Sequence, residues 1–203
     1  MTAMHPIDQL MSEHRLIESV LDAMEARVAG MTPASFPAGF FQEALDFFAN
    51  FADGYHHYKE EDALFPMLIS RGIPDQGGPI GCMLKEHVFG RSCLAGIRGN
   101  LDAARDGDTG AVEAIRAHAT DYIGMLRQHI VKEDTVLYRM ARYVLEPPDV
   151  EKLERDYANQ NNPRIPPPCA KSTRMLPPGF PPRLSRRPCR GGVPPPLLVP
   201  RRA

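Results

Sequence analysis

Apolar side chains recur every three or four positions along most of the first 145 residues, the spacing that places them on one face of a helix. The pattern predicts long helices over residues 6–30, 37–71, 79–105 and 109–145. Pro6 and Pro79 suit first helical turns, and Pro147-Pro148 would stop the last helix. No segment shows convincing strand alternation. Short connections between such helices favour an all-α, up-down-up-down four-helix bundle.

The second predicted helix contains a proline, Pro66, which lacks a backbone N–H and crowds the preceding turn. The apolar pattern nevertheless continues through Met67 and Leu68, so the sequence predicts a kink and not a helix end. We therefore place the bundle at residues 5–146, followed by a short helix or linker over residues 147–158.

The composition changes abruptly at residue 159. Residues 159–203 hold 13 of the 21 prolines, no acidic residue and many arginines. Such a segment cannot bury enough apolar surface to offset its chain entropy, so a disordered tail is predicted. A solvated, inert tail is the simplest interpretation. The alternative is a proline-rich ligand for a protein partner, which the sequence does not identify.

All 25 acidic residues lie before residue 157, so the predicted bundle is acidic although the whole chain carries a net charge of only −1. Nucleic acid is therefore not expected as its partner. No apolar run approaches the ~20 residues of a membrane span, and the first residues lack the features of a signal peptide. The cysteines form neither a CxxC pair nor a disulfide framework. We expect a soluble, cytoplasmic protein.

A short motif occurs twice, once on each of two predicted helices. Residues 56–65 and residues 129–138 both read His-x-x-Lys-Glu-acid-x-x-Leu-aromatic. A His and a Glu four residues apart lie on one helix face, one turn apart. Single histidines, His14 and His87, fall eight residues after the starts of the other two helices. At about 1.5 Å per residue, all these side chains lie near one layer of the bundle.

The first motif contains two adjacent histidines, and the neighbouring residues decide which one faces the core. The helix face of His56 continues through Ala49 and Ala52, which are small and apolar. The face of His57 continues through Asn50 and Asp53. We therefore predict that His56 and Glu60 point inward, while His57 and Glu61 lie on the flank. In the second motif, Glu133 falls on the apolar stripe and Asp134 does not.

Each of these residues has a simpler explanation when taken alone. A single inward histidine is usually a hydrogen-bonded core residue, and a single His-x-x-x-Glu is usually a surface pair. Two glutamates on core stripes, however, would be costly without a cation. The combination predicts a carboxylate-rich dimetal site of the kind found in helical bundles. Its candidate ligands are His14, His56, Glu60, His87, His129 and Glu133.

The chain resembles the hemerythrin-like, or HHE cation-binding, domain over about residues 5–145. The segments that carry the resemblance are residues 11–18, 56–66, 86–91 and 129–134. The resemblance implies a four-helix bundle with a non-haem di-iron centre, in which two iron ions share an oxo or hydroxo bridge. Glu60 and Glu133 would bridge the irons, and the four histidines would be terminal ligands.

One departure from the family pattern bears on function. Oxygen-carrying hemerythrins have a second histidine four residues after the third-helix histidine, where this chain has Arg91. An arginine stays protonated and cannot ligate iron, so we expect it to pair with a carboxylate such as Glu60 or Glu133, or to extend away from the centre. The site would then be more open than that of an oxygen carrier. Gly90 either leaves room for a diatomic ligand or lets a neighbouring helix pack closely.

The resemblance implies a protein that binds, senses or reacts with oxygen or nitric oxide, or that handles iron in a stress response. The alternative is a non-catalytic cation-binding module that serves in signalling or interaction. No catalytic residue is predicted, and an enzyme is not expected.

Overall fold

The computed structural model describes residues 4–158, and every regular element in that range is helical. The elements are α1 (Pro6–Gly30), η1 (Pro33–Ser35), α2 (Ala38–Phe47), η2 (Phe48–His57), η3 (Glu60–Leu64), α3 (Phe65–Ser70), α4 (Pro79–Arg105), α5 (Thr109–Lys132), η4 (Glu133–Leu137), α6 (Tyr138–Val144) and α7 (Pro147–Ala158). The all-α prediction is confirmed for this part of the chain. The predicted tail, residues 159–203, lies outside the described residues.

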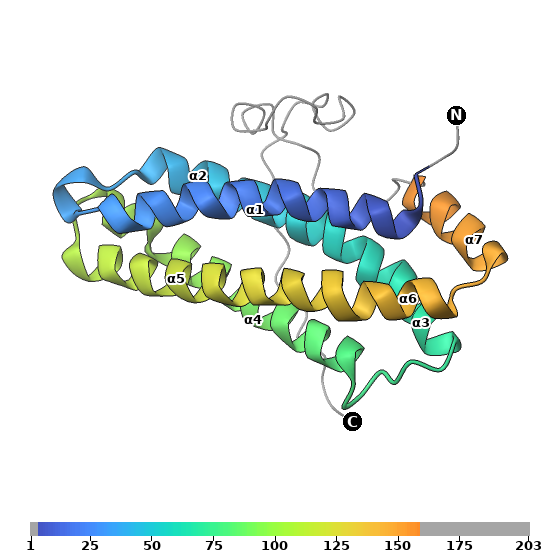
Figure 1. Cartoon of the computed structure of the whole chain (residues 1–203). Helices are drawn as coiled ribbons and strands as arrows, with labels where there is room; N and C mark the ends of the chain where they lie inside the picture. The colour runs from blue at the N-terminus through green and yellow to red at the C-terminus, as the bar shows by residue number, and fades with distance from the viewer. Residues whose placement is uncertain (1–3, 159–203) are drawn as a thin grey trace, which may run out of the picture. The chain divides into compact units, whose positions relative to one another are not determined.

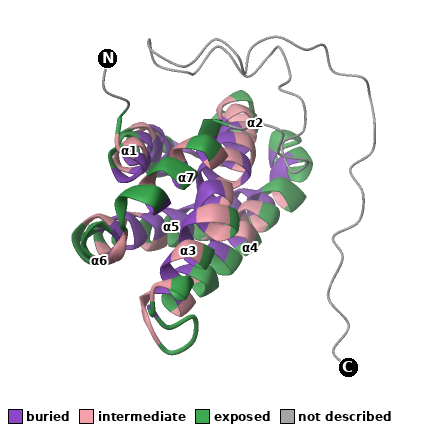
Figure 2. Cartoon of the chain, turned by 90° about the vertical axis from the view of Figure 1, so that its right-hand side faces the viewer, coloured by how far each residue is buried: buried purple, intermediate pink, exposed green. Residues whose placement is uncertain are grey.

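The long helices run alongside one another (Figure 1). α2 continues through η2 and η3 into α3, and α5 continues through η4 into α6. α4 packs mainly on α5, while α1 contacts both α5 and the α2–η2 segment. Buried positions gather along the inner faces of the helices and exposed ones along the outer faces (Figure 2).

Helix ends follow the local sequence. Pro6 and Pro79 occupy first turns, and the His5 side chain caps α1 by accepting a hydrogen bond from the Ile7 N–H at 3.2 Å. Asp108 caps α5 in the same way, since its Oδ1 accepts from the Ala111 N–H at 2.7 Å. Gly107, in the turn before it, has a φ of 90°, a conformation that L side chains rarely adopt.

Three stretches are π-helical: η2, η3 and η4. In a π-turn the backbone hydrogen bond spans five residues, as from the Phe65 N–H to the Glu60 carbonyl and from the Tyr138 N–H to the Glu133 carbonyl. The helix continues past Pro66, as predicted. Such a π-turn can form without a proline, because η4 adopts the same turn with Arg139 in the corresponding position.

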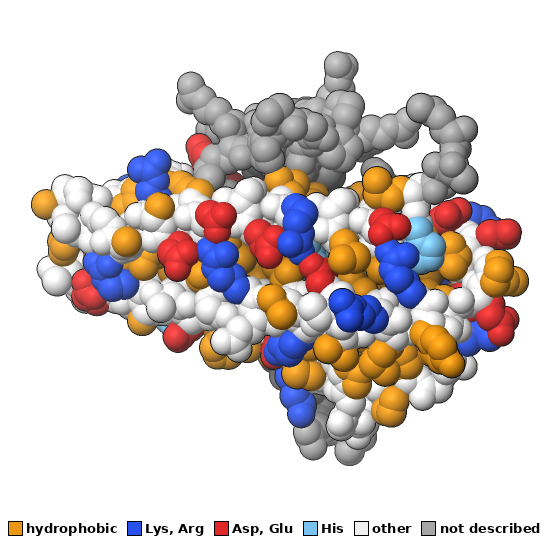
Figure 3. Space-filling model, in the orientation of Figure 1, with side chains coloured by type: hydrophobic (Ala, Val, Ile, Leu, Met, Phe, Trp, Pro, Cys, Tyr) orange, Lys and Arg blue, Asp and Glu red, His pale blue; other side chains and the backbone are white. Residues whose placement is uncertain are grey.

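The outer face that α1 and α5 present carries both signs of charge in alternation (Figure 3). Arg127 pairs with Asp22 and Glu25 at 2.6 and 2.8 Å, and Arg142 pairs with Asp8. Within residues 4–158, no helix is both long and apolar enough to cross a membrane.

α7 closes one end of the helical assembly. Its Leu153 and Tyr157 are buried in a cluster that includes Ile7, Leu10 and Leu68. Arg71 on the C-terminal side of α3 holds the start of α7 through Asp149, at 2.8 Å. The short helix predicted after the bundle is therefore present and belongs to the same core.

Candidate metal centre

The six residues predicted as ligands come together in the interior. All of them are at most 2% exposed. They come from four separate helical segments, as the two-motif pattern requires: His14 on α1, His56 and Glu60 on η2 and η3, His87 on α4, and His129 and Glu133 on α5 and η4. The predicted common layer is thus present.

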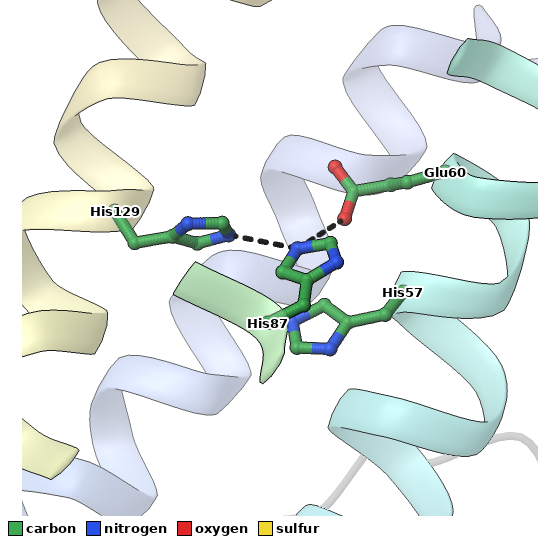
Figure 4. A group of neighbouring side chains, drawn as sticks. All are labelled: His57, Glu60, His87 and His129. Atoms are coloured by element: carbon green, nitrogen blue, oxygen red, sulfur yellow. Dashed lines mark hydrogen bonds and ion pairs between the residues drawn. The ribbon is translucent and has the colours of Figure 1, made fainter. Parts of the chain in front are cut away.

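The donor atoms form two neighbouring groups. One consists of His57, Glu60, His87 and His129, and the other of His14, His56 and Glu133. Within each group the donor atoms lie within 4.8 Å of one another. Figure 4 shows the first group, with the His87 ring between His129 and Glu60 and above His57. Each of the two groups has donor atoms close enough together to hold a metal ion.

The two glutamates lie between the groups. The Glu133 oxygens are 3.2 Å from His14 Nε2 and 3.3 Å from His129 Nε2, so this carboxylate reaches both groups. Glu60 Oε2 is 3.6 Å from His87 Nε2 and 3.8 Å from His56 Nε2. Neither Glu133 oxygen, nor Glu60 Oε2, accepts a well-formed hydrogen bond, although all three are fully buried. Buried carboxylate oxygens without donors are costly unless a cation completes them.

Each of the four histidines predicted as ligands contacts a further carboxylate on the side of its ring away from the centre, here called its outer carboxylate. The Nδ1 atoms of four histidines lie 2.7–2.9 Å from carboxylate oxygens: His14 from Asp134, His56 from Glu13, His87 from Glu61 and His129 from Glu86. This contact fixes the tautomer and the ring orientation of a metal-binding histidine and leaves Nε2 free to bind. The arrangement therefore turns four imidazole nitrogens toward the same small volume.

A basic residue in turn pairs with each outer carboxylate. Lys59 pairs with Glu13, Lys132 with Glu86, Arg15 with Asp134, and Arg91 with Glu61. Lys59 is buried and lies over the Tyr55 ring, 3.5 Å from its centroid. These cations help to hold the pKa of Glu13, Glu61 and Glu86 below the ordinary value in spite of burial, so that each remains an acceptor for its histidine.

A family comparison agrees with this geometry. The model of the family described as "Hemerythrin HHE cation binding domain" matches residues 5–141. The chain belongs to this family. Comparisons with curated proteins and with solved structures gave no match. Cation binding by this HHE domain is therefore supported both by the family and by the donor set.

In the metal-free HHE site the two buried glutamates have pKa values shifted in opposite directions. Burial raises the pKa of Glu60, as does the charge of Glu133, and the pKa of Glu60 lies well above its ordinary value. Burial also acts to raise the pKa of Glu133, but the facing His129 and His14 outweigh it and hold that pKa well below normal. The raised pKa of Glu60 favours its neutral form in the metal-free site, and metal binding would favour release of that proton.

The prediction that His57 lies on the flank is wrong. His57 is only 6% exposed, and its ring stacks on His87 with centroids 3.8 Å apart. The cause is η2, since in a π-helix residues five apart share a face. Five residues before His57 is Ala52, which is buried. Faces traced at spacings of three and four therefore assigned His57 to the wrong side.

Glu61 and Arg91 also have roles that the sequence did not reveal. Glu61 bonds His87 Nδ1 at 2.7 Å, so it contacts the centre from outside. Arg91 pairs with carboxylates, as expected, but with Asp53 at 2.6 Å and Glu61 at 2.7 Å, not with Glu60 or Glu133. The guanidinium thus stays outside the ring of histidines.

Tyr138 is a further residue at the centre. Its hydroxyl donates to Glu60 Oε1 at 2.7 Å, and its ring stacks on His14. The motif offered a signal, because the aromatic position that ends each copy is Phe65 in the first and Tyr138 in the second. Only the second can donate a hydrogen bond.

A small pocket opens beside the His57, His87 and His129 group, and Gly90 lines it. Its interior of about 10 Å³ is roughly the room that one water molecule needs. A Cβ on Gly90 would come within 2.9 Å of Met125 Cε and 3.3 Å of Tyr122 Cε2. Gly90 therefore permits close packing against α5, and it also lines the pocket next to the histidines; room for a diatomic ligand there stays a prediction.

Proposed function

We propose that this HHE domain is a four-helix bundle that holds two iron ions and uses them to bind, sense or react with oxygen or nitric oxide. Iron handling in a stress response is the related role that the same site would serve. The observation that carries the proposal is the convergence of imidazole Nε2 atoms on two fully buried glutamates, whose inward oxygens accept no well-formed hydrogen bond.

The donor set fits iron. Imidazole nitrogen and carboxylate oxygen suit non-haem iron, whereas a site for soft metals would have thiolates. Glu133 reaches both groups of donors and Glu60 approaches both, which supports the proposal that each would bridge two bound ions. Iron held by these donors would supply a change of redox state and a coordination position for a small molecule.

The protein residues around the centre orient the ligands and exclude water. The outer carboxylates hold the Nδ1 protons and direct the Nε2 atoms inward. Burial of all the proposed ligands limits access to molecules of about the size of water, which suits a diatomic ligand better than an organic substrate.

Metal analysis with optical spectroscopy tests the proposal. We expect about two irons per chain after anaerobic reconstitution, and near-ultraviolet absorption that develops on exposure to oxygen. His56→Ala should lower the stoichiometry, because it removes a donor whose Nδ1 is held by Glu13 at 2.9 Å. His118→Ala is the matched control, since His118 packs over Gly96 and is not among the donor groups.

One iron or less per chain would contradict a di-iron site. Tight binding of a colourless ion such as zinc, in preference to iron, would instead favour the alternative of a cation-binding module in signalling or interaction.

A further inference from the structure

The two halves of the centre repeat one another almost residue for residue. In both halves a Glu-His pair on one helix meets a His-x-x-Lys-Glu motif on another. Glu13 bonds His56 and Lys59, and Glu86 bonds His129 and Lys132. A residue that departs from this internal repeat therefore marks a place where the two halves differ chemically.

His57 is such a departure. The residue that corresponds to it in the second motif is Ile130, which is buried and cannot bind metal. His57 joins Glu60, His87 and His129 in one donor group, whereas the other group has only His14 and His56 as nitrogen donors. The donor group of His87 and His129 thus has three histidines available, and the donor group of His14 and His56 has two.

His57 is also the histidine with the weakest outer support. Its Nδ1 is 3.4 Å from Asp53 Oδ1, whereas the other four histidines have Nδ1 contacts of 2.7–2.9 Å. A contact of 3.4 Å lies beyond the usual range of a hydrogen bond to nitrogen. A histidine without a firm outer partner is poorly oriented and is a weaker metal ligand.

Arg91 accounts for this weak support. The same oxygen, Asp53 Oδ1, accepts a hydrogen bond from Arg91 Nε at 2.8 Å. It also forms an ion pair with Arg91 Nη2 at 2.6 Å. Arg91 also holds Glu61, the outer partner of His87, at 2.7 Å. The guanidinium therefore competes with His57 for Asp53, while the support of His87 stays intact at 2.7 Å.

The small pocket lies at this half of the centre. His57 lines it together with His87, His129 and Gly90, and Arg91 and Asp53 stand at its more exposed side. A small molecule that enters there meets His57 beside the other two histidines. In the other donor group, by contrast, the cation that pairs with the outer partner of His56 is Lys59, which is buried.

We propose that His57 is a displaceable metal ligand, and that a small molecule entering this pocket takes its place. The proposal rests on the proposed function, because it presupposes metal at the His87 and His129 group. The step is a ligand exchange: the bond from the His57 nitrogen to the metal breaks, the bond to the incoming molecule forms, and no electrons are transferred.

Azide is a suitable probe of the exchange, because it is a small, stable ligand of ferric iron with an infrared stretch of its own. The full-length, iron-loaded protein is titrated with azide and followed by its absorption and by that stretch. Azide can bind only where His57 has left the metal. The apparent affinity for azide is therefore the intrinsic affinity multiplied by the fraction of sites in which His57 is not bound. His57→Ala should therefore keep about two irons and bind azide roughly tenfold more tightly. His57→Gln, which preserves more of the side-chain volume, should behave in the same way.

Arg91→Met provides the converse test. It frees Asp53 to bond His57, so the imidazole should be held more firmly and azide should bind roughly threefold more weakly than to the unmodified protein. His118→Ala should leave both iron content and azide affinity unchanged.

The failures of the two proposals are distinguishable. An unmodified protein that holds one iron or none overturns the proposed function before any azide is added. If His57→Ala and His57→Gln both lose iron, His57 is an obligatory ligand and the exchange proposal is overturned. It is equally overturned if iron content, spectrum and azide affinity in both variants match those of the unmodified protein, since His57 would then not bind the metal.

Discussion

At the scale of single residues, four histidines and Glu60 each have one polar atom held by a partner and a second polar atom directed into the interior. Each of four histidines commits Nδ1 to a carboxylate at 2.7–2.9 Å and keeps Nε2 for the interior. Glu60 is divided in the same manner, because Tyr138 occupies Oε1 and leaves Oε2 without a donor. The direction of each donor is thus fixed before any metal binds, which reduces the reorganisation that binding requires.

Tyr138→Phe should destabilise the metal-free protein by about 1–3 kcal/mol, because it leaves a buried carboxylate oxygen of Glu60 without its donor. Chemical denaturation of the metal-free protein measures the effect. Tyr157→Phe is the matched control: the Tyr157 hydroxyl is buried without a hydrogen-bond partner, so its removal should be neutral or slightly stabilising. Equal effects of the two substitutions would show that the Tyr138 hydroxyl contributes nothing through Glu60.

At the scale of elements, the π-turns decide which side chains reach the interior. A turn that spans five residues shifts the helix face by one position relative to an α-turn. Within η2 this shift brings both His56 and His57 inside, at 1% and 6% exposure. An α-helix could present only one of two adjacent residues so directly.

Pro66→Ala should leave iron content unchanged and alter stability by no more than about 1 kcal/mol. The reason is that η4 keeps the same π-turn without a proline, so the turn before Pro66 should persist as well. Metal analysis and thermal unfolding of the variant check this. A large loss of metal would mean that Pro66 maintains the π-turn on which Glu60 lies.

The π-helical elements explain which side-chain positions could be predicted from the sequence and which could not. Helical periodicity was sufficient to predict the burial of His14, His87 and His129, because these residues lie on regular α-helices, where burial follows the apolar face. His56, Glu60 and Glu133 lie on π-helical elements, and their burial was predicted from the repeated motif together with the neighbouring apolar residues. His57 could not be placed, since sequence periodicity assumes α-helical turns and η2 is not α-helical. The partners of Arg91 could not be found either, because Asp53 and Glu61 approach it across helices and carry no periodic signal.

At the scale of the whole molecule, the buried charges make the metal-free domain sensitive to pH. Burial alone would lower the pKa of His14, but Asp134 and Glu133 raise it to about 9. A histidine with a raised pKa stabilises the fold fully below its ordinary pKa near 6.5, and this contribution is lost as the pH rises through about 9. Burial lowers the pKa of His56 to about 4, so His56 adds no change above pH 6.5.

The metal-free protein should therefore lose stability between pH 7 and pH 9, by about 2 kcal/mol from His14 alone. The metal-bound protein should lose much less, because its histidines are already neutral. Denaturant titrations at the two pH values, with and without iron, measure the difference. A metal-free protein that is equally stable at both values would show that His14 is not protonated in the fold.

Deleting residues 160–203 should leave iron content and helicity nearly unchanged. This expectation rests on the proline-rich, acid-free composition of that segment, which disfavours a packed core. Metal analysis and circular dichroism of the shortened protein test it. A markedly lower melting temperature would show that the deleted residues contribute to the fold.

The burial of α7 has a consequence for where this fold begins and ends as an autonomous unit. The family match stops at residue 141, yet Leu153 and Tyr157 complete the apolar cluster around Ile7 and Leu10. A fragment trimmed to the matched residues would expose that cluster to water and would be prone to self-association. Anyone who transplants this centre into another protein must therefore carry residues up to 158 with it.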